Sequence, residues 1–250
     1  MSGILNAIGG SISSAFAWLK GGKSMVNPVA TWVGVGVTFA AVLVALLKDE
    51  FWRLARRPAL QASIELKSPD CQKTQMSVSN LLTGQVKSWP CYYFRIWVKN
   101  TGKSRAEKVQ VFMSRLLRQC ADKSFHEEEH FDPMNLKWAH DHLLFADAIS
   151  PKMGKHCDFF HINSPQMRSD GAAPYTLSTV PAAETIIEFD TEVVPNNFGN
   201  LIGQGTYRVE LVIAGANVGP ISKTFEIVLS GKWYDDGKQM FADGVGVTRV

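Results

Sequence analysis

The sequence predicts a mainly β protein, in which an antiparallel β-sandwich follows an N-terminal transmembrane α-helix. Two observations carry this prediction. Residues 29–47 form an uncharged, mostly apolar run, and from Leu60 onward apolar and polar residues alternate with a period of two. The 250-residue chain, with a formal net charge of +3, therefore divides into three parts: an N-terminal segment (1–27), a transmembrane helix with a basic juxtamembrane extension (28–57), and a sandwich domain (58–250) with a long middle insertion at about 121–181.

The apolar run is long enough to cross a bilayer, because a hydrocarbon core of about 30 Å needs roughly 20 residues in a helix. Asn27 and Pro28 suit the N-cap and the first helical position. Trp32 and Trp52 stand near the two expected interfaces, as in an aromatic belt. The alternatives are a buried helix of a soluble domain and a cleaved signal peptide. A signal peptide is disfavoured because no basic residue precedes Lys20.

Lysine and arginine are more frequent after the apolar run than before it. Lys20 and Lys23 precede the run, whereas those that follow are Lys48, Arg53, Arg56, Arg57 and Lys67. The positive-inside rule therefore predicts a single-pass membrane protein with a cytoplasmic C-terminal domain. The juxtamembrane cations fit lipid headgroups, and the folded part has no basic stripe with interleaved aromatics, so nucleic acid is not an expected partner. Small residues such as Gly34 and Thr38 permit self-association through the helix.

The N-terminal segment begins with 19 residues that carry no charged side chain. Its apolar residues recur at three- and four-residue steps, at Ile4, Ile8, Ile12, Phe16 and Leu19. This pattern predicts an amphipathic helix in the membrane interface. A helical hairpin with a second span, turning at residues 20–23, is the alternative. Either way the bilayer is an expected partner, and a membrane-perturbing effector with a regulatory sandwich is one functional hypothesis.

Alternation of apolar and polar residues predicts strands in the folded part. The predicted segments are 62–66, 93–100, 107–114, 158–162, 185–189, 207–213 and 223–229. Short strands separated by turn residues are typical of a sandwich. Near the C-terminus, Trp233 and Tyr234 precede Asp235-Asp236-Gly237, which predicts a closing turn whose aromatic rings pack on the sandwich edge.

Two segments carry a resemblance to a known family. Asn100-Thr-Gly102 forms a turn signal between two predicted strands, and Gly205-Thr-Tyr207 opens a late strand. These segments resemble the immunoglobulin-like sandwich modules of fibronectin III and CARDB type. The resemblance covers about 65–229 and implies a fold without an activity. It also implies that the Asn-x-Gly turn joins neighbouring strands and that Tyr207 occupies a tyrosine corner.

One catalytic motif is present, and its context disfavours catalysis. His126-Glu-Glu-Glu-His130 matches H-E-x-x-H, in which two histidines on one helical face bind zinc and the glutamate, here Glu127, is the general base. His140 or His142 would complete such a site. However, the segment is a charged run, and Pro133 would stop a helix. A zinc-dependent hydrolase is therefore only an alternative, and we expect a solvated acidic loop, no catalytic residue, no cofactor and no metal.

The four cysteines are Cys71, Cys91, Cys120 and Cys157, without a C-x-x-C pair. In a cytoplasmic domain they would be reduced, whereas two disulfides would be available in an exported one. We therefore predict a membrane-anchored, non-enzymatic sandwich protein that presents an interaction module as a sensor, adaptor or scaffold subunit, with another protein as its partner. Residues 125–145 are either its binding surface or an extra strand pair that completes the core.

Overall fold

The computed structural model describes residues 28–79, 84–173 and 177–250, and the predictions made for residues 1–27 lie outside this part of the chain. The chain divides into two units, Met1–Ala55 and Arg56–Val250. In the first unit, α2 (Pro28–Ala55) is a helix of 28 residues. Its apolar side chains are exposed, with 75% of Trp32, 65% of Val37 and 71% of Leu46 accessible. Among the described residues, no helix meets the length and apolarity that crossing a membrane requires.

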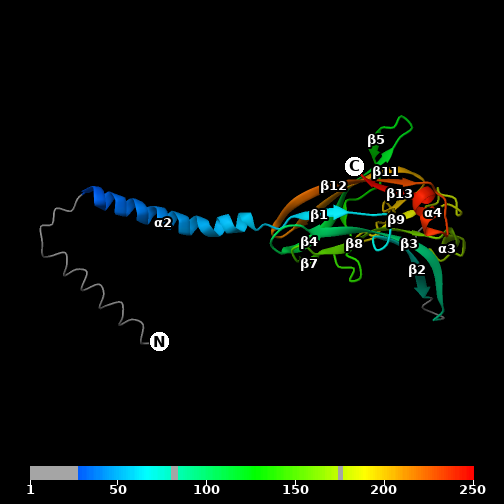
Figure 1. Cartoon of the computed structure of the whole chain (residues 1–250). Helices are drawn as coiled ribbons and strands as arrows, with labels where there is room; N and C mark the ends of the chain where they lie inside the picture. Colours follow the sequence, from blue (N-terminus) through cyan, green and yellow to red (C-terminus); the bar gives the residue numbers. More distant parts are fainter. Residues whose placement is uncertain (1–27, 80–83, 174–176) are drawn as a thin grey trace. The chain divides into compact units, whose positions relative to one another are not determined.

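The second unit is built from two antiparallel sheets, which confirms the mainly β prediction (Figure 1). Within the described residues, the first sheet has the order β1-β3-β8-β9-β10, with β2 also on β3. The second has the order β13-β12-β11-β4-β5, with β6 and β7 also on β4. The strands of the first sheet are β1 (Leu60–Ser63), β2 (Cys71–Ser79), β3 (Val86–Asn100), β8 (Gly154–Asn163), β9 (Ile187–Phe189) and β10 (Leu201–Ile202). Those of the second are β4 (Ala106–Gln119), β5 (Phe125–Glu127), β6 (Met134–Asn135), β7 (Ala146–Ile149), β11 (Gly205–Gly215), β12 (Val218–Leu229) and β13 (Val245–Arg249).

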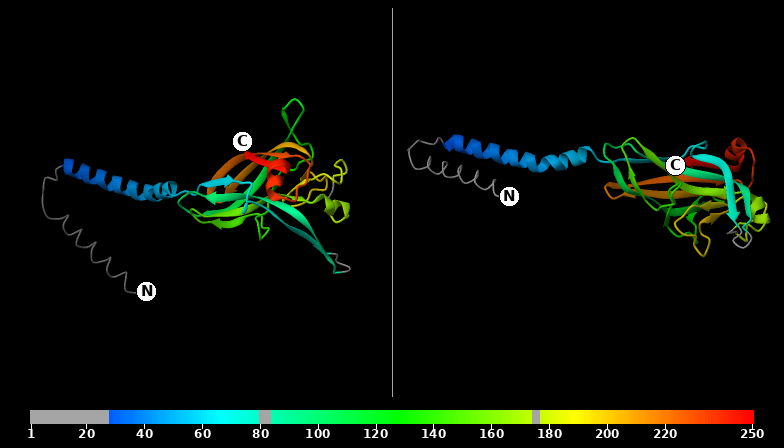
Figure 2. Two further views of the ribbon diagram at one scale, coloured as in Figure 1. Left: turned by 45° about the vertical axis from the view of Figure 1, so that its right-hand side comes forward. Right: turned by 90° about the horizontal axis from the view of Figure 1, so that it is seen from below.

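The core lies between the sheets because each long strand turns alternate apolar side chains inward. In β3, Phe94, Ile96 and Val98 are fully buried. Across the core, the rings of Phe159 in β8 and Phe225 in β12 have centroids 5.8 Å apart. The N-terminal half of β3 (residues 86–94) pairs with β2, and this hairpin extends beyond the body of the sandwich (Figure 2).

Residues 134–139 hydrogen-bond to both sheets and so close one side of the sandwich. The Leu136 amide donates to the Val111 carbonyl of β4 at 2.8 Å, whereas the Asp158 amide of β8 donates to the Lys137 carbonyl at 2.9 Å. The indole of Trp138 is buried and donates to the Val109 carbonyl. This part of the range 125–145 therefore lies in the core, and β8, which also falls within the expected insertion, is a central strand of the first sheet.

The Asn-x-Gly turn connects β3 of the first sheet to β4 of the second, so it passes between the sheets rather than joining paired strands. Asn100 is fully buried there. Its amide group donates to the carbonyls of Ser104 and Ile149, at 2.7 and 2.9 Å. Its side-chain oxygen accepts from the amides of Ala59 and Gly102, at 3.2 and 3.0 Å. One side chain thus holds together the turn, the end of β7 and the point where the chain enters the domain.

The short helices α3 (Pro165–Ser169), α4 (Gly237–Gln239) and η1 (Met240–Gly244) lie outside the sheets. After β12 the chain turns back, and its aromatic residues pack on the sandwich edge. The rings of Trp233 and Tyr92 have centroids 5.1 Å apart, and the Tyr92 hydroxyl donates to the Tyr234 carbonyl at 3.0 Å. The turn then leads through α4 and η1 into β13, which pairs with β12.

Candidate functional site

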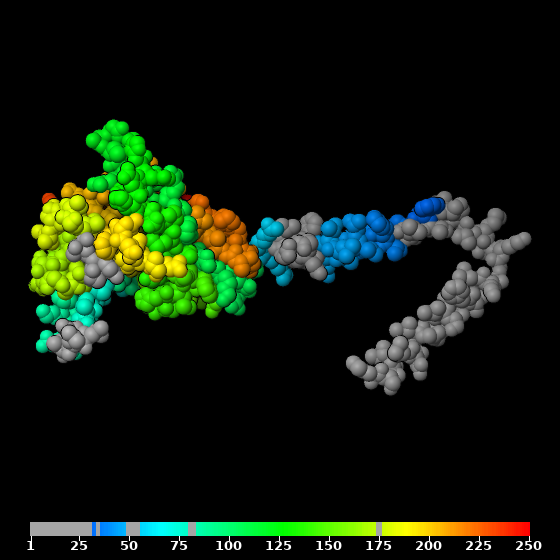
Figure 3. Space-filling view, turned by 180° about the vertical axis from the view of Figure 1, so that it is seen from behind, coloured from blue at the N-terminus to red at the C-terminus, as the bar shows by residue number. Residues whose placement is uncertain are grey.

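A cavity of about 480 Å³ opens at the end of β4 opposite to the Asn100 turn. Its walls come from the region of β5 and from residues 177–204, drawn in green and yellow in Figure 3. The lining residues combine polar and apolar groups: Arg118, Glu128, His130, Leu177, Thr179, Val180, Pro181, Glu184, Asn197, Phe198, Gly199, Leu201, Ile202, Gly203, Gln204 and Tyr207. A concave site with an apolar wall and a few polar groups is the usual form of a binding pocket.

Arg118 and Tyr207 form the charged and aromatic side of this cavity. The guanidinium of Arg118 lies 5.8 Å from the centroid of the Tyr207 ring. Burial raises the pKa of the Tyr207 hydroxyl, and the Arg118 charge opposes that rise. Among the ion pairs of the described residues, none includes Arg118, whose side chain is exposed. The group therefore offers a cation on an aromatic face to an acidic group of a ligand.

Contacts with the His130 backbone hold another part of the cavity wall in place. The Asn197 side chain donates to the His130 carbonyl at 3.0 Å. Gly199 lies so close to the His130 carbonyl that a Cβ at this position would overlap it. These contacts join the segment that follows β5 to the turn before β10, although 67 residues separate Asn197 from His130 in the chain.

The structure places the H-E-x-x-H segment on strand β5 and the following turn, not on a helix. Because neighbours in a strand point to opposite sides, this backbone does not present His126 and His130 as a helix would. The His126 ring lies 3.0 Å from the Ser124 hydroxyl, and Glu127 forms an ion pair with Arg115 at 2.6 Å. His140 and His142 lie in a separate turn, both with positive φ. In the described part of the chain, no group of three or more histidine, cysteine or acidic residues is arranged to hold a metal ion.

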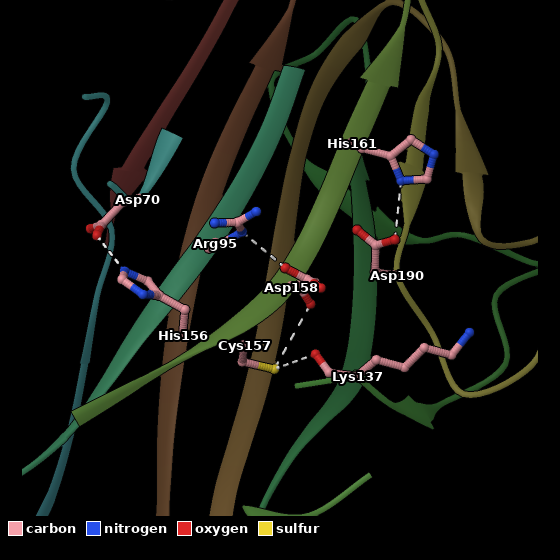
Figure 4. A network of polar contacts seen from close by, with 8 residues as sticks. All are labelled: Asp70, Arg95, Lys137, His156, Cys157, Asp158, His161 and Asp190. Carbon is pink, nitrogen blue, oxygen red and sulfur yellow. Dashed lines mark hydrogen bonds and ion pairs between the residues drawn. The ribbon is translucent and has the colours of Figure 1, made fainter. Parts of the chain in front are cut away.

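A second polar site lies on the face of the first sheet that is turned away from the core. Here β3 and β8 place residues in three cross-strand pairs, Tyr93 with His161, Arg95 with Asp158, and Trp97 with His156. We call these six residues the polar ladder. Figure 4 shows how neighbouring elements supply further partners. Arg95 binds Asp158 at 3.1 Å, His161 binds Asp190 at 3.1 Å, and His156 binds Asp70 at 2.9 Å.

The charges of the polar ladder depend on one another because burial removes them from water. Burial disfavours a charge on His161, but Asp190 and Glu188 outweigh this effect and raise its pKa to about 10. Burial and the nearby Asp190 charge raise the pKa of Asp158, against the pull of Arg95. His161 is therefore an imidazolium at neutral pH, stacked on the Tyr93 ring at 5.2 Å. This paired network is suited to holding β3, β8 and β9 in register.

The sequence alone indicated some residues of these two sites, but not which residues from other strands lie beside them. It named His130 and Tyr207, but for other roles, and the alternation in residues 93–100 placed Tyr93, Arg95 and Trp97 on one face. The partners of these residues come from β8, β9 and the loop before β2, which a local pattern does not reveal.

The cysteines of the domain are all free. Cys71, Cys91 and Cys157 are buried, whereas Cys120 is exposed at the end of β4. Burial raises the pKa of the Cys71 thiol to about 12, and it also raises the pKa values of Cys91 and Cys157. Cys120 is therefore the thiol that a reagent in water reaches in the folded domain.

The chain was compared with protein-family models, curated proteins and solved structures. None of the three comparisons finds a match. The arguments for function consequently come from the fold, the cavity and the charges described above.

Proposed function

We propose that this chain is a membrane-anchored, non-enzymatic β-sandwich protein that presents an interaction module as a sensor, adaptor or scaffold subunit. The observation that carries the proposal is α2. This helix has 28 residues, which corresponds to a length of about 42 Å. It includes the uncharged run 29–47 and exposes apolar side chains such as Val37 and Leu46. Exposed apolar side chains along a helix favour burial in an apolar environment, which a lipid bilayer would supply.

The charges and the cysteines support a cytoplasmic position for the domain. Lys48, Arg53, Arg56 and Arg57 follow the apolar run closely, which favours retention of this side in the cytoplasm. Free cysteines fit a reducing compartment. Self-association through Gly34 and Thr38 is compatible with the same anchor.

The module itself is proposed to be a divergent immunoglobulin-like sandwich. Two antiparallel sheets around one core support this, as does Tyr207, which is buried at the start of the late strand β11. The cavity beside Tyr207 is the proposed binding site of the module. Its exposed Arg118 fits a partner that offers an aspartate, a glutamate or a C-terminal carboxylate.

Alkaline carbonate extraction of membranes from cells that express the full chain tests the anchor. We expect the wild-type chain to stay in the membrane pellet. A variant with Val37→Lys and Val44→Lys should move to the soluble fraction, because each central charge opposes insertion by about 3 kcal/mol. The matched control carries Val193→Lys and Val228→Lys, at exposed valines of the sandwich, and should stay in the pellet. Release of the wild-type chain by carbonate would refute the anchor.

A membrane-impermeant maleimide tests the side of the membrane, and the native chain already carries the thiol. We expect Cys120 to be protected in intact cells and labelled after lysis, with Cys120→Ser as the blank. Labelling of intact cells would place the domain outside the cytoplasm.

The binding role of the cavity is tested by purifying the full chain in mild detergent from its own host. A stoichiometric protein partner should copurify with wild-type chain and with the control Lys232→Glu, but not with Arg118→Glu. Equal recovery of the partner with Arg118→Glu would exclude the Arg118 side of the cavity as the contact.

A further inference from the structure

We propose that the end of the domain at which the chain enters is a docking surface for anionic phospholipid headgroups of the bilayer that holds the anchor. This inference rests on the proposed membrane anchor. The surface, called the basic end below, contains five exposed cationic residues: Arg57, Lys99, Lys103, Arg105 and Lys152. If it docks as proposed, the sandwich has a defined orientation on the membrane, with its cavity pointing away.

Backbone and side-chain hydrogen bonds bring these cations together from separate loops. The backbone amide of Asn100 donates to the Met153 carbonyl at 2.9 Å, and the backbone amide of Lys152 donates to the backbone carbonyl of Asn100 at 2.7 Å. These two bonds place the loop between β7 and β8 beside the turn between β3 and β4. The β11–β12 hairpin joins the same end, because the Asn217 side chain donates to the Arg105 carbonyl at 2.8 Å.

The entering chain is held against the same turn. The Thr101 amide donates to the Ala59 carbonyl at 2.7 Å, and the Lys103 amide donates to the Arg57 carbonyl at 3.2 Å. Gly102 permits this contact, since a Cβ there would lie 2.5 Å from the Arg57 carbonyl oxygen and 2.6 Å from the Pro58 Cα. The chain that leaves the anchor therefore leads directly into the basic end.

The length of the connection keeps the basic end close to the lipid surface. Residues 47 and 57 are separated by at most about 19 Å, with about 12 Å of helix to Ala55 and two extended residues. The headgroup layer occupies roughly 5–8 Å of this distance. The remaining distance is at most about 11–14 Å, and any tilt of the helix shortens it toward the Debye length of about 8 Å at physiological salt, within which the cations and the headgroup charges interact.

Positive charge at this end exceeds the nearby negative charge. Ion pairs among the described residues include none of the five cations. Glu107 is the only acid in residues 99–107 and 150–153, and the nearby Asp147 is paired with Lys108 at 2.6 Å. Met153 is 63% exposed in the same loop and offers an apolar side chain to the interface. Anionic lipids complement this combination, and the continuity with the anchor favours them over a nucleic acid.

The test uses the full chain in vesicles of phosphatidylcholine, with or without phosphatidylserine and with a trace of headgroup-labelled acceptor lipid. A donor dye is placed at Ala216→Cys, on the exposed β11–β12 hairpin, in a Cys120→Ser background. We expect energy transfer to rise with phosphatidylserine and to fall again in 1 M salt, where the Debye length is about 3 Å.

The charge dependence has a matched control. A variant with Lys99→Gln, Lys103→Gln, Arg105→Gln and Lys152→Gln should lose the response to phosphatidylserine, at about five-fold in the docking equilibrium for each cation. The control variant replaces the same number of exposed cationic residues at the opposite end with glutamine, at Lys87, Lys123, Lys232 and Lys238, and should respond like the wild type.

Flotation of the vesicles separates the two proposals. If the chain floats with the vesicles but energy transfer is the same in both lipid mixtures, the basic end does not dock and the anchor stands. If the chain does not float, the anchor proposal and this inference both fail. If the floating chain binds a DNA duplex in preference to phosphatidylserine, the lipid assignment is overturned.

Discussion

Asn100 offers the sharpest test of the architecture, because one buried side chain makes four hydrogen bonds that join three segments. Its bond to the Ile149 carbonyl is buried, and those to Ala59, Gly102 and Ser104 are partly buried. In Asn100→Ala, the buried carbonyl loses its partner at a cost of about 1–3 kcal/mol, and each of the other bonds contributes about 1 kcal/mol. We expect the free energy of unfolding of the domain to fall by about 4–6 kcal/mol, which is the sum of these contributions.

The assay is urea unfolding of the full chain in non-ionic detergent, followed by tryptophan fluorescence. For a domain of this size the same loss lowers the midpoint of thermal unfolding by about 10–20 °C. Asn217→Ala is the matched control, since Asn217 makes two bonds at the same end of the domain but is exposed. We expect a cost below about 1 kcal/mol for the control. Similar costs for the two variants would refute the role of Asn100 as the buried junction of the entry point, the turn and β7.

Three further predictions follow from the packing and the charges. Gly102→Ala should loosen the entering chain and speed trypsin cleavage after Arg56, because its Cβ would meet backbone atoms of Arg57, Pro58 and Ala59. Gly219→Ala has open space and should be cleaved at the wild-type rate. His161→Gln should lower the stability by about 2 kcal/mol below pH 6.5. This cost should shrink as pH rises toward 10, because the pKa of His161 is higher in the folded than in the unfolded state and the stabilisation is lost between the two values. Unfolding curves measured across this pH range would reject the pairing if the cost stayed constant. Titration with a thiol reagent should count one reactive cysteine, Cys120, in the native chain and four after denaturation, and a second fast thiol in the native chain would contradict the buried positions of the others.

The strands that the sequence predicted are those with one face on the core. Each of the seven predicted segments overlaps a strand, and β3, β4, β11 and β12 contain the clearest alternation. By contrast, β2 was not predicted, because beyond Cys71 its residues are mostly polar and partly exposed. It forms because the edge of β3 offers a partner for its backbone, and that pairing leaves no hydrophobic period in the sequence. The short strands β5, β6, β7, β10 and β13 were missed because segments of two to five residues are too short to show a hydrophobic period.

The candidate sites depended on tertiary structure to a greater degree. The H-E-x-x-H spacing has chemical meaning only on a helix, and the pairing of Phe125–Glu127 with β4 makes it part of a strand. Arg118 belongs to no motif, and Tyr207 was expected only in a tyrosine corner. The two residues meet because the pairing of β4 with β11 sets them opposite each other. The sequence predicted the turn at Asn100, but not that this turn connects strands of two different sheets.

By itself, the sequence determined the β class of the domain, the positions of its long strands and the helix with an uncharged run that precedes them. These follow from side-chain periodicity, which reports locally whether a residue faces the core or the solvent. Only the tertiary structure decided which strands are neighbours, and with that the cavity, the polar ladder and the basic end. The physical reason is that strand pairing joins backbone groups of segments far apart in the chain, and the free energy of that choice is a property of the whole core.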